Sequence, residues 1–171
     1  MKRKEYMPAG YLGTCRMGEL AEVAFMYRAA SQGIAVAKPY GNSLPYDFLV
    51  QHGRRLLRIQ VKSCFSPQRG RCAGFPIIAA SHWAGKKVGY TADQIDFIAA
   101  FIAKHDAWYL IPLELLGSRQ NIRLYPSGQK AKRGGGFEQY REAWNLLKDE
   151  AQAGPVDAAT EATLIHVAAG V

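Results

Sequence analysis

The sequence has few of the residues that cross-link a chain or anchor it in a membrane. Its 171 residues include three cysteines, which cannot all pair with one another, and no apolar leader with a small-residue cleavage site precedes the first polar block. Asp, Lys or His interrupts every apolar stretch well before the roughly 20 residues that a membrane span needs. We therefore expect a cytoplasmic protein with free thiols and no membrane insertion.

Acidic residues are also scarce: 14 Asp and Glu stand against 22 Lys and Arg, for a formal charge of +8. This balance favours a polyanionic partner, nucleic acid first, although a basic surface that only keeps the protein soluble would have the same composition. The 49% of apolar residues is enough to bury one core. We expect one domain over residues 1–150 and a flexible or helical tail over residues 151–171.

The spacing of apolar residues predicts an α/β fold, with a mixed sheet and helices packed on its faces. Helical spacing marks two segments, residues 16–32 through Leu20, Val23, Ala24 and Tyr27, and a closing helix through Phe137, Tyr140, Trp144 and Leu147. Strands are expected at residues 34–38, 46–50, 56–63, 75–80, 95–103 and 108–112. Turns at residues 51–54 and 104–106 would close two hairpins.

Polar residues with catalytic potential gather around the first of these hairpins. Side chains alternate along a strand, so Gln60 and Lys62 share one face while Ile59 and Val61 point toward a core. If the turn closes the hairpin, Asp47 comes near Gln60 and Lys62, although the sequence leaves the register open. A carboxylate, an amide oxygen and an ammonium group would then meet in space.

These groups suit the metal-assisted cleavage of a phosphodiester. Mg²⁺, with Mn²⁺ as a substitute, prefers oxygen ligands, which Asp47, the Gln60 amide and the Val61 backbone carbonyl would supply. Lys62 would orient or deprotonate the attacking water and stabilise negative charge in the transition state. Glu22, on the first helix, would hold the metal or its water from the other side.

Each of these residues also has a simpler interpretation. Asp47 could cap backbone amides in a loop, Lys62 could be an exposed strand lysine, and Glu22 could pair with a neighbour on a solvated helix face. A zinc cluster of Cys64, Cys72 and His82, perhaps joined by Cys15, matches no paired-ligand spacing, so we favour free thiols.

Four basic clusters fall in predicted loops, where flexible cations reach the phosphates that flank a cut. They are Arg54 with Arg55, Arg69 with Arg71, Lys86 with Lys87, and the group Lys130, Lys132 and Arg133; we favour the last two as DNA contacts. Any one of them could equally be a solvated patch. Phosphate contacts position DNA without reading its sequence, so the clusters do not indicate a target.

The string Gly18-Glu-Leu-Ala-Glu22, then Tyr46-Asp47, then Gln60-Val-Lys62 resembles the PD-(D/E)XK nuclease superfamily over roughly residues 16–115. That superfamily includes restriction endonucleases and archaeal Holliday junction resolvases, and the chain is most similar to the small bacterial endonucleases associated with group I introns, which accept a glutamine at the position of Gln60. Tyr46 stands where the motif has its proline, which here comes one residue earlier. The resemblance implies a restriction endonuclease-like α/β/α sandwich.

The expected activity is therefore Mg²⁺-dependent hydrolysis of double-stranded DNA. One such site cuts one strand, so a double-strand break implies a homodimer or a higher oligomer. Two alternatives stay open. One is a junction resolvase or a restriction or repair nuclease of the same fold; the other is a nucleic-acid-binding protein that lost turnover with the carboxylate at position 60.

Overall fold

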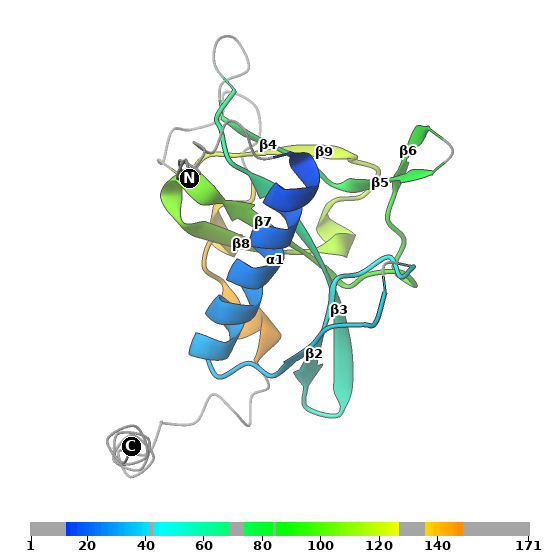
Figure 1. Ribbon diagram of the computed structural model, residues 1–171, viewed down its shortest axis with the longest axis vertical. Helices are drawn as coiled ribbons and strands as arrows, with labels where there is room; N and C mark the ends of the chain where they lie inside the picture. The colour runs from blue at the N-terminus through cyan, green and yellow to red at the C-terminus, as the bar shows by residue number, and fades with distance from the viewer. Residues whose placement is uncertain (1–12, 42, 69–73, 84, 127–135, 149–171) are drawn as a thin grey trace, which may run out of the picture.

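The computed structural model describes residues 13–41, 43–68, 74–83, 85–126 and 136–148, and these build one mixed sheet with a helix against it. The sheet has the order β1-β2-β3-β7-β8, with bounds Val36–Ala37, Phe48–His52, Arg55–Cys64, Phe97–Ile102 and Ala107–Pro112. β3 and β7 are parallel, and the other neighbours are antiparallel. Helix α1, Thr14–Ser31, crosses one face of the sheet (Figure 1). No helix in the described part of the chain is long and apolar enough to cross a membrane.

Helix α1 has nearly the predicted length, but the predicted buried face is wrong. Leu20, Val23 and Tyr27 keep 44%, 58% and 75% of their surface exposed. The helix instead buries Ala21, Phe25 and Ala29, spaced at i, i+4 and i+8. The small alanines on either side of the Phe25 ring let the helix approach the sheet closely. A prediction based on the spacing of large apolar residues does not identify a buried face made mostly of alanine.

Aromatic rings fill the space between α1 and the sheet. The Phe25 ring lies 5.1 Å from the centroid of Phe48 and 5.6 Å from that of Trp108. Trp144, from the end of the described chain, lies 5.8 Å from both Phe25 and Trp108. These contacts make the first of the two hydrophobic cores and fix α1 against the strands next to the hairpin.

A two-stranded ribbon, not a helix, covers the opposite face of the sheet. β4, Phe75–Ile78, pairs antiparallel with β9, Asn121–Leu124, and the inward side chains of both strands join the second core. The predicted α/β/α sandwich is therefore correct in its mixed sheet, while the described residues contain only one α-helix. The sequence analysis did not predict β9.

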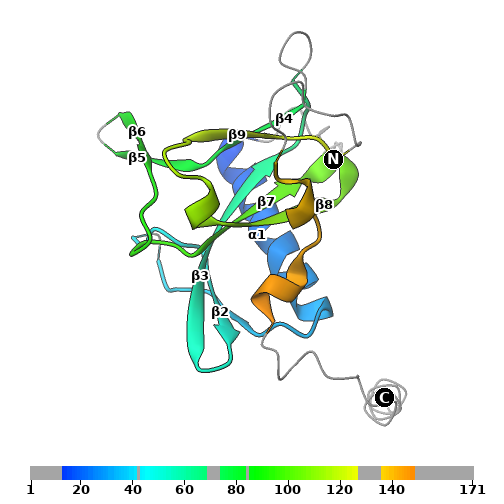
Figure 2. The ribbon, with the colours of Figure 1, turned by 180° about the vertical axis from the view of Figure 1, so that it is seen from behind.

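The region between β3 and β7 also differs from expectation. The predicted strand at residues 75–80 divides into β4 and β5, Ala80–Trp83, with Ala79 between them. β5 pairs with β6, Lys86–Gly89, in a hairpin that projects from the body of the molecule (Figures 1 and 2). Lys86 and Lys87, which we expected in a loop, therefore lie on a strand.

The predicted closing helix is replaced by two 3-10 turns, Glu138–Tyr140 and Trp144–Leu147. Arg141 is extended and Glu142 has a φ of 52°, which ends helical geometry between the turns. The reason is local: the Glu142 carboxylate accepts hydrogen bonds from the Trp108 backbone N–H at 2.7 Å and the Trp144 indole N–H at 2.8 Å. Residues 141 and 142 therefore bind the edge of β8, through the Glu142 carboxylate and an antiparallel bridge between Arg141 and Tyr109.

An ion pair ties together the starts of the parallel strands β3 and β7. Asp96 Oδ2 accepts hydrogen bonds from the Arg58 backbone N–H at 2.7 Å and from its Nε at 3.0 Å. The same guanidinium reaches the backbone carbonyls of Ala92 and Asp93. Burial alone would raise the pKa of the Asp96 carboxyl, but these Arg58 contacts outweigh it and lower the pKa.

Candidate active site

The hairpin of β2 and β3 places Asp47 beside Gln60 and Val61. The Asp47 N–H donates to the Ile59 carbonyl at 2.9 Å, and the Val61 N–H donates to Asp47 Oδ2 at 2.7 Å. In a continuing strand pair the Val61 N–H would donate to a backbone carbonyl of β2. Here the Asp47 carboxylate takes the place of that carbonyl. The register that the sequence left open is Phe48 opposite Ile59, with a two-residue turn whose Gly53 has a φ of 60°.

The Gln60 amide joins Asp47 to Tyr90. Its Nε2 donates to Asp47 Oδ2 and, at 3.2 Å, to the Val61 carbonyl, while its Oε1 accepts from the Tyr90 hydroxyl at 3.1 Å. A half-turn of the amide would place Oε1 beside Asp47 and Nε2 beside Tyr90. A phenol both donates and accepts hydrogen bonds, so Tyr90 can hold the amide in either orientation.

Lys62 lies half-buried on the same face of β3 as Gln60, whereas Ile59 and Val61 are buried on the other face. Its Nζ is 5.3 Å from the centroid of the Tyr90 ring, within cation–π range. Burial lowers the pKa of the Lys62 ammonium, and the negative charge of Asp47 opposes that shift. An ammonium of lowered pKa gives up its proton more readily than an exposed lysine does.

Two carboxylates approach each other at the end of the hairpin. Burial raises the pKa of the Asp47 carboxyl to about 6, and the negative charge of Glu22 on α1 adds to the rise. Glu22 Oε2 forms an ion pair of 2.6 Å with Lys38 Nζ, whose positive charge also acts on Asp47. Sequence reasoning missed Lys38; its one signal was its place just before the loop that leads to Asp47.

The structure therefore brings together Asp47, Gln60, Val61 and Lys62, with Glu22 close by. Of the simpler interpretations, the one for Lys62 is wrong, because Lys62 is half-buried. Asp47 does accept a hydrogen bond from a backbone amide, that of Val61, and Glu22 does pair with a cation, Lys38. Five of the basic residues singled out from the sequence, namely Arg69, Arg71, Lys130, Lys132 and Arg133, lie outside the described residues, as do Cys72 and the predicted tail, residues 151–171.

Cysteines contribute little to the chemistry of this site. Cys15 and Cys64 are free thiols, the first exposed and the second buried. Burial raises the pKa of the Cys64 thiol, which makes it a poorer nucleophile. Within the described ranges, no group of three or more His, Cys, Asp and Glu side chains is placed to hold a metal ion. The zinc cluster considered from the sequence includes Cys72, which lies outside the described residues, so that alternative is not tested.

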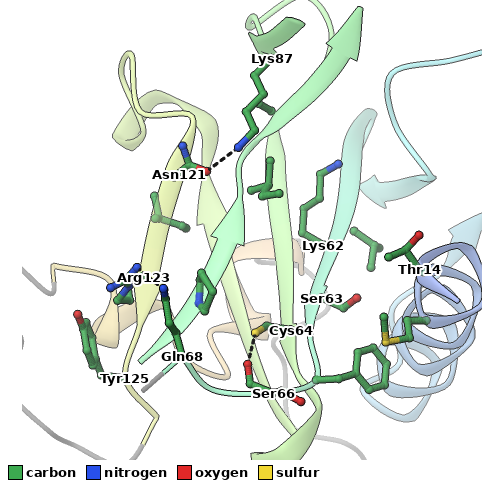
Figure 3. Close-up of a pocket in the computed structure, with 18 residues that line it drawn as sticks. Thr14, Lys62, Ser63, Cys64, Ser66, Gln68, Lys87, Asn121, Arg123 and Tyr125 are labelled. Carbon is green, nitrogen blue, oxygen red and sulfur yellow. Dashed lines mark hydrogen bonds between the residues drawn. The ribbon is translucent and has the colours of Figure 1, made fainter. Parts of the chain in front are cut away.

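Lys62 opens onto a cleft of about 1070 Å³. Its floor is the end of β3, from Val61 to Ser66, and its walls are the start of α1 and the ribbon β4–β9. Figure 3 shows Lys62 between Thr14 on one side and Asn121 and Arg123 on the other. Among the residues that the structure describes, the charged ones that line the cleft are Lys62, Lys87 and Arg123, and none of the lining residues is acidic.

The oxygen donors near Lys62 fit a hard divalent cation, and the one on Val61 belongs to a residue that also lines the cleft. They are the carboxylates of Asp47 and Glu22, the Val61 carbonyl and, after a half-turn, the Gln60 amide oxygen, all of the oxygen class that Mg²⁺ prefers. Burial is the main cause of the raised pKa of Asp47, and the repulsion from Glu22 that adds to it is the kind that a bound cation relieves. Only two of these four donors are carboxylates, so the site differs from a cluster of three His, Cys, Asp or Glu side chains, which the described residues do not contain.

The sequence of residues 12–147 matches the PD-(D/E)XK endonuclease family. The chain is a PD-(D/E)XK endonuclease. Asp47 and Gln60-Val-Lys62 lie within the matched residues. None of the curated proteins matches the sequence significantly.

Solved structures support the fold of this PD-(D/E)XK endonuclease. The bacterial homing endonuclease I-Ssp6803I superposes with a TM-score of 0.67, is 24% identical, and is aligned over 79% of this chain and 93% of its own. The resemblance to the restriction endonuclease-like fold is thereby confirmed. MepB matches at a TM-score of 0.39 and 11% identity, over 80% of this chain and 95% of its own, which is too distant to support an argument.

Proposed function

We propose that this PD-(D/E)XK endonuclease is a Mg²⁺-dependent enzyme that hydrolyses double-stranded DNA in the manner of a homing endonuclease. The observation that supports this most directly is the cluster of Asp47, Gln60 and Val61 beside Lys62, which opens onto a cleft whose charged lining, among the described residues, is all positive. The similarity to I-Ssp6803I, whose name states that it is a homing endonuclease, favours the same class of activity.

The chain's own residues suggest a division of labour. Asp47, Glu22 and the Val61 carbonyl would hold the cation, with the Gln60 amide turned by Tyr90 so that its oxygen faces the same point. A bound Mg²⁺ would supply positive charge to the phosphoryl oxygens as negative charge develops on them. Lys62, with its lowered pKa, would orient the attacking water, accept its proton and stabilise the transition state.

The cation Lys87 would contribute to DNA binding rather than to chemistry. It lies on β6 at the rim of the cleft, where its Nζ is exposed and 3.4 Å from Asn121 Oδ1. Lys86 is exposed on the same strand. We propose that both contact phosphates, that the enzyme acts as a homodimer or a higher homo-oligomer on its target, and that it works in the cytoplasm. These assignments rest on charge, on the one-strand chemistry of a single site and on the sequence.

Nicking of supercoiled plasmid DNA tests the proposal. Wild-type protein should nick the plasmid with Mg²⁺ or Mn²⁺ and stop when EDTA is added, while Asp47→Asn and Lys62→Ala should each lose cleavage and keep most of their DNA affinity. Asp106→Asn and Lys104→Ala make the same chemical changes on an exposed turn outside the cleft and should cut normally. Cleavage by Asp47→Asn or Lys62→Ala at the wild-type rate would refute the assignment.

A change at Gln60 separates an active enzyme from an inactive binding protein. If the glutamine is a working ligand, Gln60→Glu should alter the nicking rate only modestly, because an amide oxygen is replaced by a carboxylate oxygen at the same place. If wild-type protein does not cut with any divalent ion and Gln60→Glu does, the chain is a binding protein that has lost turnover.

A further inference from the structure

The ribbon β4–β9 turns an alternating set of side chains toward the cleft. One face is buried in the core through Phe75, Ile77, Ile122 and Leu124. The other face presents Pro76 opposite Arg123 and Ile78 opposite Asn121, and all four of these residues line the cleft that contains Lys62. The side chains of the ribbon therefore alternate with a period of two, and the face toward the cleft carries polar residues on β9 and apolar residues on β4.

The polar groups on this face are of the kinds that recognise base edges. A guanidinium matches the two acceptors of guanine, and the amides of Asn and Gln match the donor and acceptor of adenine. Arg123 Nη2 donates to Gln68 Oε1 at 2.9 Å, and Lys87 Nζ donates to Asn121 Oδ1 at 3.4 Å. Gln68 and Arg123 thus orient each other, Lys87 orients Asn121, and all four residues line the cleft (Figure 3).

Gly74 fixes Gln68 in this arrangement. Its backbone exchanges two hydrogen bonds with Gln68, at 2.8 and 3.1 Å, with a φ of 119° that side-chain-bearing residues rarely adopt. A Cβ at Gly74 would lie 2.6 Å from Tyr125 Cε1 and 2.9 Å from Arg123 Cγ. The backbone that holds Gln68 therefore packs directly against the Arg123 stem, and no larger residue fits between them.

The ribbon also has the right size and charge for a duplex. The major groove of B-DNA is about 12 Å wide and admits a two-stranded ribbon, whose strands lie roughly 4.8 Å apart. Ile78 is 43% exposed beside Asn121, an apolar group of the sort that contacts a thymine methyl. The cationic lining of the cleft would meet the phosphates on either side.

From this geometry we infer that the outer face of the ribbon β4–β9 enters the major groove and reads bases. Arg123, Gln68 and Asn121 are the specificity-determining residues. The DNA strand whose phosphate lies at Lys62 is the strand that is cut. The inference rests on the proposed DNA cleavage for the identity of the duplex, and it adds the element and the side chains that select the target.

Selection of bound duplexes from a pool with a randomised segment, in Ca²⁺ to prevent turnover, measures the sequence preference. Arg123→Ala and Asn121→Ala should each lose about ten- to a hundredfold of the preference at one or two base positions and keep the rest of the selected consensus. Arg54→Ala and Asn145→Ala, the same changes at exposed positions outside the cleft, should select the wild-type consensus. Thermal melts show that each variant is folded.

Arg123→Lys distinguishes base reading from a phosphate contact. It keeps the charge but not the planar fork, so it should retain the affinity and salt dependence of binding to a fixed mixed-sequence duplex while losing the preference at its base position. Lys86→Met, at an exposed lysine of β6 with no hydrogen bond to the described ribbon residues, should do the reverse, lowering the salt slope by about one and leaving the consensus unchanged. An unchanged consensus in Arg123→Lys, Arg123→Ala and Asn121→Ala would overturn the inference.

The same experiment separates this inference from the proposed nuclease function. A wild-type protein that nicks plasmid with Mg²⁺ but selects no consensus is an endonuclease whose ribbon does not read bases, and the inference fails alone. If the wild-type protein selects a consensus that Arg123→Lys alters, but never nicks plasmid, the nuclease proposal fails and the inference that the ribbon reads bases stands.

Discussion

At the scale of single residues, Asp47 combines two roles that make conflicting demands on its charge. As a ligand it has to be ionised, yet burial and the nearby Glu22 raise its pKa to about 6. A carboxyl whose folded pKa exceeds its unfolded value destabilises the fold above that folded pKa. The penalty disappears as the pH falls from about 6 toward the ordinary value of 3.8. Metal-free protein should therefore gain stability from Asp47 as the solution becomes mildly acidic.

Asp47→Asn should abolish nicking and, in EDTA at pH 7, raise the free energy of unfolding by about 1–3 kcal/mol, because one pKa unit corresponds to roughly 1.4 kcal/mol. The Asn side chain can still accept the hydrogen bond from the Val61 N–H. Urea denaturation of both proteins at pH 7 and pH 5 measures the difference, which should shrink at the lower pH. Asp106→Asn is the control, and an equal loss of stability in Asp47→Asn at both pH values would contradict the argument.

The Tyr90 hydroxyl should matter for the cation through its hold on Gln60. Tyr90→Phe removes the group that fixes the amide, so the affinity for Mn²⁺ should fall about tenfold, as is typical when the partner of a metal ligand is lost. Calorimetric titration with Mn²⁺ measures the affinity without any cleavage assay. Tyr40→Phe, the same change on a fully exposed side chain, should bind Mn²⁺ like wild type. Equal affinities in all three proteins would show that Tyr90 does not position the amide.

At the scale of secondary-structure elements, the buried face of α1 can be tested directly. Phe25→Ala removes a fully buried ring from between Phe48, Trp108 and Trp144 and should cost about 3–5 kcal/mol of unfolding free energy. Tyr27→Ala, two residues along on the exposed side, should change stability by no more than about 0.5 kcal/mol. Chemical denaturation gives both values. Comparable losses of unfolding free energy in the two variants would mean that Tyr27 lies on the buried face of α1, as the sequence predicted.

The contact between Arg58 and Asp96 should make the pairing of β3 and β7 sensitive to acid. Because Arg58 lowers the pKa of Asp96, the stabilisation is fully present above the unfolded value of 3.8 and is lost as the pH falls through the lower folded value. Asp96→Asn should cost roughly 1–3 kcal/mol at pH 7, because a hydrogen-bonded ionic partner is lost. The difference from wild type should narrow below pH 3.8. Denaturation curves across this range measure it, and a pH-independent difference would argue against the ion pair.

At the scale of the whole molecule, the sequence predicts the strands that position the site better than the layers around them. The hairpin with Asp47, Gln60 and Lys62 is read correctly because a strong turn and strict alternation are local signals. The ribbon β4–β9 is missed because its strands are short and lie far apart in the sequence. The closing helix fails because Glu142 satisfies the backbone of a distant strand, a tertiary contact that helical spacing at Phe137 and Trp144 does not reveal.

The number of catalytic clusters per chain also leads to a prediction at this scale. With one cluster per chain, a monomer cuts one strand, and a double-strand break needs two chains on the same target. At low protein concentration, nicked circles should form at a rate proportional to protein concentration, and linear plasmid at a rate closer to its square. Initial rates over a dilution series measure both orders. A first-order formation of linear DNA with no nicked intermediate would mean that dimers persist throughout the dilution.

The hydrogen bond from the Val61 N–H to the Asp47 carboxylate also bears on how this protein could evolve. The side chain closes the end of a strand pair, so deleting it would fray the hairpin as well as end catalysis. Descendants released from selection for cutting should thus accept asparagine at position 47 far more often than alanine or valine. An asparagine at this position in a related sequence would indicate a domain that still folds and binds DNA but no longer cleaves it.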